Sequence, residues 1–153
     1  MKLHKLKFNT TINANISDVW AFFINPNNLE VLTPNNMQFK ITCDADNTMY
    51  AGKIISYVIT PLANIPMTWG TEITQCKELD YFIDEQRFGP YKFWHHVHQF
   101  IEDDGKTKMT DELTYSFYGG AIGDLIQNKI ITKKIEGIFN YRSIKINEYF
   151  HAS

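Results

Sequence analysis

The sequence predicts an α+β fold: a curved, seven-stranded antiparallel sheet with two short helices and one long C-terminal helix. Two observations lead to this prediction. Between residues 37 and 117, short apolar-polar runs are separated by turn residues, and the connections are too short for crossover helices, so the strands should form an antiparallel meander. Beyond Gly120 the apolar period changes to that of a helix, which should run from Leu125 to Phe150.

The elements follow in order along the chain. Residues 6–12 alternate apolar and polar side chains, as in a half-buried strand. Ser17 is expected to cap a short helix that ends at Asn25-Pro26, and a second short helix should cover Asn28 to Leu32. The remaining strands are predicted at 37–43, 53–60, 67–76, 80–87, 92–101 and 107–117. Turn residues separate these strands, and Asp103-Asp104-Gly105 is the clearest turn among them.

Length and composition predict a single domain over residues 1–153. The chain is 44% hydrophobic and 14% aromatic, which is ample for a core. Its 15 Lys+Arg and 17 Asp+Glu give a net charge of -2, so nothing favours nucleic acid or an anionic membrane as partner. With neither a signal-peptide core nor an apolar membrane span in this sequence, we expect a cytoplasmic protein. Cys43 and Cys76 form no CxxC pair, so reduced thiols and no cofactor are expected.

The segment from Phe93 to Phe100 concentrates aromatic and imidazole side chains. Strand periodicity places Trp94, His96, His98 and Phe100 on one face and the intervening residues on the other. Such a face is either a polar seam in a core or the wall of a pocket. His-x-His on a strand also suggests a metal, but two ligands do not make a site, so no metal is expected.

A carboxylate belongs to the same inner surface. In the strand at 107–117, Asp111 alternates in phase with apolar residues, and a hairpin about residue 104 brings it near His96 and His98. Arg142 lies on the helical stripe facing the sheet, where it could form an ion pair with Asp84, Glu85 or Asp111. The alternatives for these groups are structural: hydrogen-bonded core histidines, and an ion pair that ties helix to sheet.

The order of elements resembles that of the SRPBCC superfamily. The motifs that carry the resemblance are Phe88-Gly89-Pro90-Tyr91, the strand from Trp94 to Phe100, Met109-Thr110-Asp111 and Phe139-Asn140-Tyr141-Arg142. The chain looks most like a bacterial, polyketide cyclase-like branch, and the resemblance covers nearly all of it. It implies a helix-grip fold, shared with START domains and Bet v 1, and a deep pocket for a hydrophobic small molecule.

Three functions are compatible with this sequence. The first is a carrier or sensor that holds a hydrophobic or aromatic molecule, lipid-like or polyketide-like, between sheet and helix. The candidate ligand-binding residues are Trp69, Gln86, Trp94, His96, His98, Asp111, Tyr115, Phe117, Ile135 and Arg142. The alternative is a cyclase, dehydratase or hydrolase that uses His96 or His98 as acid/base with Asp111 holding the ring. A protein-interaction domain would require an exposed apolar patch near residues 59–66, a segment better suited to gating the cavity mouth or to packing locally.

Overall fold

The computed structural model describes residues 2–43, 48–62, 65–118 and 120–151. Its sheet has the spatial order β1-β7-β6-β5-β4-β3-β2, and every neighbouring pair is antiparallel. The strands are β1 (His4–Ile12), β2 (Lys40–Ile41), β3 (Ile54–Leu62), β4 (Ile65–Lys77), β5 (Tyr81–Phe88), β6 (Phe93–Asp103) and β7 (Lys106–Ser116). The predicted seven-stranded antiparallel sheet is confirmed.

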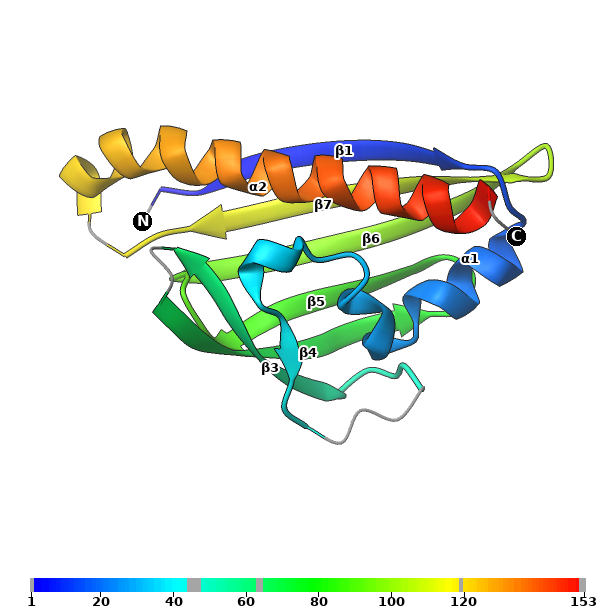
Figure 1. Ribbon diagram of the computed structural model, residues 1–153, viewed down its shortest axis with the longest axis horizontal. Helices are drawn as coiled ribbons and strands as arrows, with labels where there is room; N and C mark the ends of the chain where they lie inside the picture. The colour runs from blue at the N-terminus through cyan, green and yellow to red at the C-terminus, as the bar shows by residue number, and fades with distance from the viewer. Residues whose placement is uncertain (1, 44–47, 63–64, 119, 152–153) are drawn as a thin grey trace.

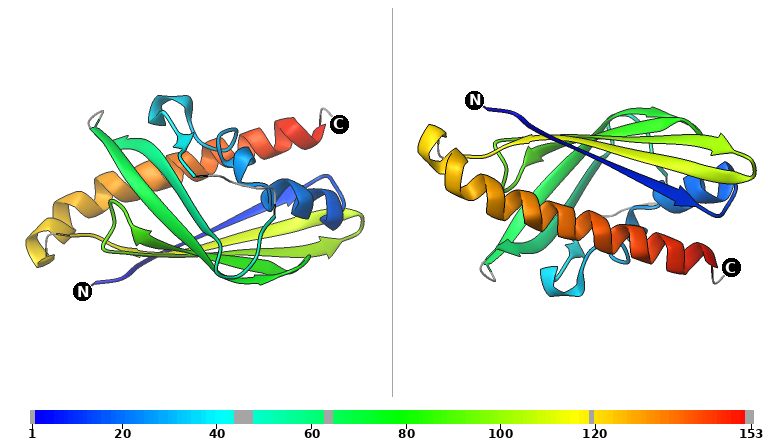
Figure 2. Two further views of the ribbon diagram at one scale, coloured as in Figure 1. Left: turned by 90° about the horizontal axis from the view of Figure 1, so that it is seen from below. Right: turned by 90° about the horizontal axis from the view of Figure 1, so that it is seen from above.

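The helices are α1 (Ile16–Phe23) and α2 (Gly120–His151), with 3-10 turns η1 (Pro26–Leu29) and η2 (Asn35–Met37) between α1 and β2. Figure 1 shows α2 lying along β1 and β7, while α1 lies near the C-terminal end of α2. Figure 2 shows the twisted sheet curling around one side of α2, with β3 and β4 crossing it obliquely. None of the described helices is long and apolar enough to cross a membrane.

Several predicted boundaries were wrong. Asn15, not Ser17, caps α1, because its side-chain oxygen accepts a hydrogen bond from the Asp18 amide at 2.9 Å. The predicted helix at Asn28–Leu32 is the shorter turn η1, which Pro26 starts two residues earlier. The predicted strand at 37–43 is limited to β2, since η2 and a left-handed Gln38 occupy its beginning. The long helix starts at Gly120, five residues before the predicted Leu125.

The turn between β6 and β7 was predicted correctly and determines the geometry of the site. Asp104 (φ 51°) and Gly105 (φ 73°) both have positive φ, as a tight two-residue hairpin turn requires. The register that follows pairs His98 directly with Asp111. One hairpin therefore brings an imidazole and a carboxylate together on the inner face.

The inner face of the sheet and the stripe of α2 enclose the core. Along β6, His96, His98 and Phe100 are buried and Trp94 is half-buried, as the alternation predicted. On α2, Ile135, Phe139 and Ile146 are buried, whereas Ile130 and Ile144 are exposed. The Phe139 ring stacks on Phe8 of β1 with centroids 4.1 Å apart. At the other end, the Phe22 ring of α1 packs against Tyr149 and Phe150. The helix is thus fixed to β1 by Phe139 and to α1 near its C-terminal end.

Candidate functional site

A cavity of about 160 Å³ lies between α2 and the inner face of the sheet. Strands β3 to β6 form one wall and α2 forms another, while residues from α1, η1 and η2 line the end beside α1. Most of the lining side chains are apolar. A single long helix contacts the strongly curved sheet only along part of its surface, so the space beside it stays open.

Aromatic rings form one wall of the cavity. The Trp69 and Trp94 rings meet edge to face with centroids 5.1 Å apart, and Tyr91 lies 4.6 Å from Trp94. The Tyr57 ring stacks on Trp69 with centroids 5.7 Å apart. Trp69 is buried, yet its Nε1 donor has no hydrogen-bond partner among the described residues. The wall thus offers aromatic surface together with one unused donor.

Two histidines and two aspartates, Asp84, His96, His98 and Asp111, form a closed network that we call the His–Asp cluster. Asp84 Oδ2 lies 2.9 Å from His98 Nε2 and 3.3 Å from His96 Nδ1. On the other side of the rings, Asp111 Oδ1 lies 2.9 Å from His96 Nε2 and 2.8 Å from His98 Nδ1. The last of these contacts is poorly directed, and His98 Nδ1 has no hydrogen bond among the described residues. Each imidazole lies between two carboxylates.

The cluster carries charge despite its burial. Burial alone would raise the pKa of both carboxyl groups, but the hydrogen bonds and charges of His96 and His98 hold the pKa values of Asp84 and Asp111 well below their usual range. For His96, burial favours the neutral ring, but the charge of Asp84 and the hydrogen bond to Asp111 raise its pKa overall. Ionised carboxylates and a protonated His96 stabilise one another.

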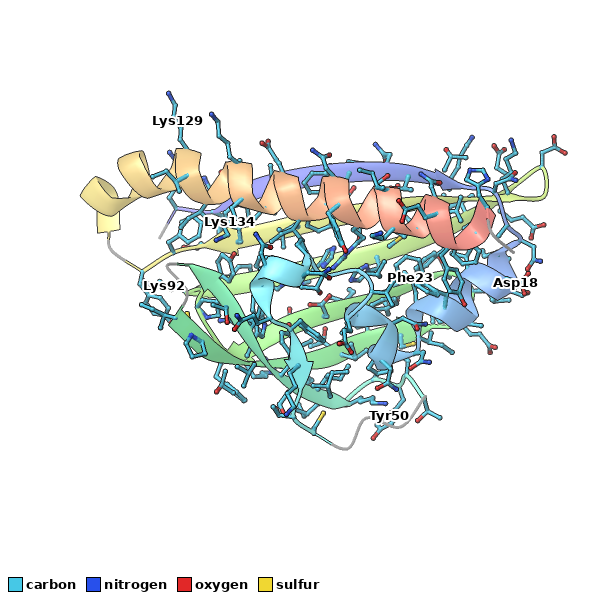
Figure 3. All side chains as sticks on the ribbon, in the orientation of Figure 1. Asp18, Phe23, Tyr50, Lys92, Lys129 and Lys134 are labelled. Carbon is cyan, nitrogen blue, oxygen red and sulfur yellow. The ribbon has the colours of Figure 1, made fainter. Side chains whose placement is uncertain are left out.

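The cavity-facing stripe of α2 also carries two cations. Lys134 and Arg142 line the cavity beside Ile135, Ile138 and Phe139. The Arg142 guanidinium lies 4.9 Å from the centroid of the Phe139 ring, a cation–π contact. Figure 3 shows Lys134 on the side of α2 nearer the lower strands and Lys129 projecting from its opposite side.

The predicted ion pair of Arg142 with Asp84, Glu85 or Asp111 was wrong. Within the part of the chain that the structure describes, Arg142 forms no ion pair, and its buried Nε has no hydrogen-bond partner. Asp111 and Asp84 are occupied by the two histidines instead. The guanidinium therefore reaches the cavity with donor capacity left over.

The structure separates the remaining candidates into two groups. Trp69, Trp94, Phe117 and Ile135 line the cavity together with His96, His98 and Arg142. Three predicted residues, Gln86, Asp111 and Tyr115, do not line it. The Gln86 amide is bonded to the backbone of Tyr91, and the Tyr115 hydroxyl lies 2.8 Å from Thr132 Oγ1 of α2. Asp111 lies behind the two histidines.

Sequence reasoning gave Asp84 too small a role. It named this residue only as a partner for Arg142, yet Asp84 lies directly opposite His96 in the β5–β6 ladder and lines the cavity. The available signal was its position two residues after the buried Phe82, which places both side chains on the same face of β5. Tyr57 and Tyr91 were likewise absent from the candidates and belong to the aromatic wall.

A second histidine–carboxylate pair lies on the other face of the same strands. His95 Nδ1 is 2.6 Å from Glu85 Oε1, and both side chains are about 30% exposed (32% and 28%). The pair is therefore a natural control for the His–Asp cluster, because it shares the strands but not the cavity.

Comparison with known proteins agrees with this architecture. No protein-family model matches the chain, and no curated protein does. Among solved structures, protein Ms6760 from Mycobacterium smegmatis is 18% identical with a TM-score of 0.69, over 99% of this chain and 98% of its own. Ara h 8.0201 is 14% identical with a TM-score of 0.65, over 99% and 100% of the two chains. Major latex-like protein 151 from Panax ginseng is 14% identical with a TM-score of 0.70, over 97% of each. The chain thus has the helix-grip fold that these solved structures share.

Proposed function

We propose that this protein binds an amphipathic small molecule in the cavity, as a carrier or sensor. The molecule has a hydrophobic or aromatic body, lipid-like or polyketide-like, and one acidic group. The observation that carries the proposal is the pair of buried donors, Trp69 Nε1 and Arg142 Nε, which lack partners among the described residues and belong to side chains lining a largely apolar cavity.

The apolar body is matched by the aromatic wall. Flat rings at Trp69, Trp94 and Tyr91 present both faces and edges, so they suit an aromatic or fused-ring ligand as well as an alkyl chain. Ile135 and Ile138 of α2 supply aliphatic contact from the opposite side. Burying such a ligand removes apolar surface from water on both partners.

The acidic group is matched by the cations of α2. Arg142 and Lys134 line the cavity, and among the described residues neither forms an ion pair. A buried donor without a partner is costly, so a ligand that supplies an acceptor gains more than an ordinary hydrogen bond. Arginine also binds carboxylates through two parallel N–H groups, which fixes the orientation of the ligand.

The test measures displacement of the fluorescent probe 1-anilinonaphthalene-8-sulfonate by 2-naphthoic acid and by its methyl ester. The acid should bind more tightly than the ester to the native chain. Arg142→Met should reduce that preference by roughly tenfold or more, since a charge-assisted hydrogen bond contributes about 1.5–3 kcal/mol. Lys129→Met is the matched control, because Lys129 is an exposed lysine of the same helix that does not line the cavity.

Two results would contradict the proposal in different ways. Equal affinity of the native chain for acid and ester would show that the cavity does not select ligands with an acidic group. Unchanged probe binding in Ile138→Trp, which fills the cavity with a larger side chain, would place binding elsewhere. Native mass spectrometry of protein from its own host would then identify a copurifying molecule, whose chemistry should match an apolar body with an acid.

A further inference from the structure

We propose that the His–Asp cluster is a binding site for a divalent transition-metal ion. Asp84, His96 and His98 are the ligands, and Asp111 orients the His96 ring through a hydrogen bond and lies close to the His98 ring. This inference goes beyond small-molecule binding. It rests on three side chains of the cluster, Asp84, His96 and His98, that also line the cavity.

The donor atoms are already close enough to bind one ion. One ligand atom each from Asp84, His96 and His98 can be chosen so that all lie within 4.8 Å of one another. Asp84 Oδ2 is 2.9 Å from His98 Nε2 and 3.3 Å from His96 Nδ1. Ligand atoms around a tetrahedral zinc ion, bound at about 2.0–2.1 Å, are about 3.3 Å apart. Small side-chain adjustments would therefore place these atoms around one ion.

The hydrogen bond from Asp111 favours the His96 tautomer that a metal requires, and Asp111 also lies beside the His98 ring. Its Oδ1 faces His96 Nε2 at 2.9 Å and His98 Nδ1 at 2.8 Å. When these nitrogens carry the protons, the lone pairs of His96 Nδ1 and His98 Nε2 are directed toward Asp84. A carboxylate behind a metal-binding histidine is the usual second partner of such rings. Asp111, which had no place in the cavity lining, acquires a role in this arrangement.

The three ligand residues line the cavity, and Asp111 does not. Asp84, His96 and His98 line the cavity, whereas Asp111 lies behind them. Two imidazoles and one carboxylate leave coordination positions on the open side for water or for a ligand donor. This donor set suits zinc or ferrous ions better than calcium or magnesium, which prefer oxygen ligands.

The experiment titrates the untagged, chelator-treated protein with Zn²⁺ by calorimetry and with Co²⁺ by visible absorption. We expect one equivalent of each ion to bind, with Co²⁺ giving ligand-field bands. Asp84→Asn and His98→Gln should each weaken Zn²⁺ binding about tenfold or more, and Asp111→Asn by about 10–100-fold. Glu85→Gln and His95→Gln, on the other face of the same strands, should leave it unchanged.

Absence of saturable binding to the native chain would overturn the proposal, as would equal Zn²⁺ affinity in Asp84→Asn, His98→Gln and the native chain. Circular dichroism checks that each variant is folded. Should the cluster variants fail to fold, zinc-edge X-ray absorption on the native chain decides the question: scattering from two imidazoles supports the site, and scattering from one or none refutes it. These measurements use no small-molecule ligand, so their outcome is separate from that of the naphthoic acid experiment.

Discussion

The Asp111 Oδ1 atom lies 2.9 Å from His96 Nε2 in the middle of the sheet, where each side chain is only 4% exposed. Asp111 of β7 is the cross-strand partner of His98 in β6. Its well-directed hydrogen bond is nevertheless to His96, which precedes His98 by two residues in β6. One carboxylate thus bonds the His96 ring and lies within 2.8 Å of the His98 ring.

Removing the Asp111 carboxylate should strongly destabilise the fold. Below pH 6.5, where the raised pKa of His96 favours the protonated ring, Asp111→Ala leaves that ring buried without one of its two counter-charges, which typically costs about 3–5 kcal/mol. Urea denaturation followed by circular dichroism measures the free energy of unfolding. Glu112→Ala is the control, since Glu112 pairs with Lys7 on the exposed face of the same strand. Similar losses in the two variants would show that the buried network contributes nothing special.

The stability of the protein should depend on pH in two directions. Asp84 and Asp111 have pKa values below their ordinary 3.8, so their contribution is lost as the pH falls below about 4. His96 has a pKa above its ordinary 6.5, so its contribution is complete below pH 6.5 and is lost as the pH rises through the folded-state pKa. The cluster therefore stabilises the fold most between about pH 4 and 6.5.

Denaturation midpoints measured across this pH range check the prediction. His96→Gln should reduce the fall in stability on the alkaline side, whereas His95→Gln should leave it as in the native chain. If the stability of His96→Gln falls as steeply at alkaline pH as that of the native chain, another titrating group causes the effect.

The stability of the fold should fall when the side-chain amide nitrogen of Gln86 is replaced by an oxygen. Its Nε2 donates to the Tyr91 carbonyl at 2.6 Å, and its Oε1 accepts from the Tyr91 amide at 3.2 Å. Gln86→Glu places a carboxylate oxygen against that carbonyl, so we expect a loss of about 1–3 kcal/mol in unfolding free energy. Gln75→Glu, at an exposed position that accepts from Tyr81, should change little. No difference between these two variants would mean that the Gln86 bonds do not hold the turn before Tyr91.

Two glycines should respond to alanine with opposite signs. A Cβ added at Gly105 or at Gly137 meets no atom within 4 Å, so only the backbone conformation distinguishes them. Gly105 has φ of 73°, and alanine there should cost about 1 kcal/mol. Gly137 lies within α2, where alanine should add about 0.5–1 kcal/mol. Thermal melts of the two variants should therefore shift in opposite directions, and a shift of the same sign would contradict the argument.

The sequence by itself determined the sheet, its meander and the inner face of β6. Alternation placed His96 and His98 on the buried side, and the two-residue turn at Asp104-Gly105 allowed only one register with β7, which brought Asp111 to them. The helical period likewise identified the buried stripe of α2, including Ile135 and Phe139. These are local patterns, so they can be read without knowing where distant segments lie.

Only the tertiary structure decided which side chains share the cavity. The longer connection between β5 and β6 does not fix their register, so the position of Asp84 opposite His96 was not determined by the turn. Likewise, the rotation of α2 and its distance from the curved sheet depend on packing at separated points, such as Phe8 against Phe139. That packing brings Arg142 to the cavity while the histidines occupy both aspartates. Helical spacing defines a face, but the partner that the face meets depends on the curvature of the whole sheet.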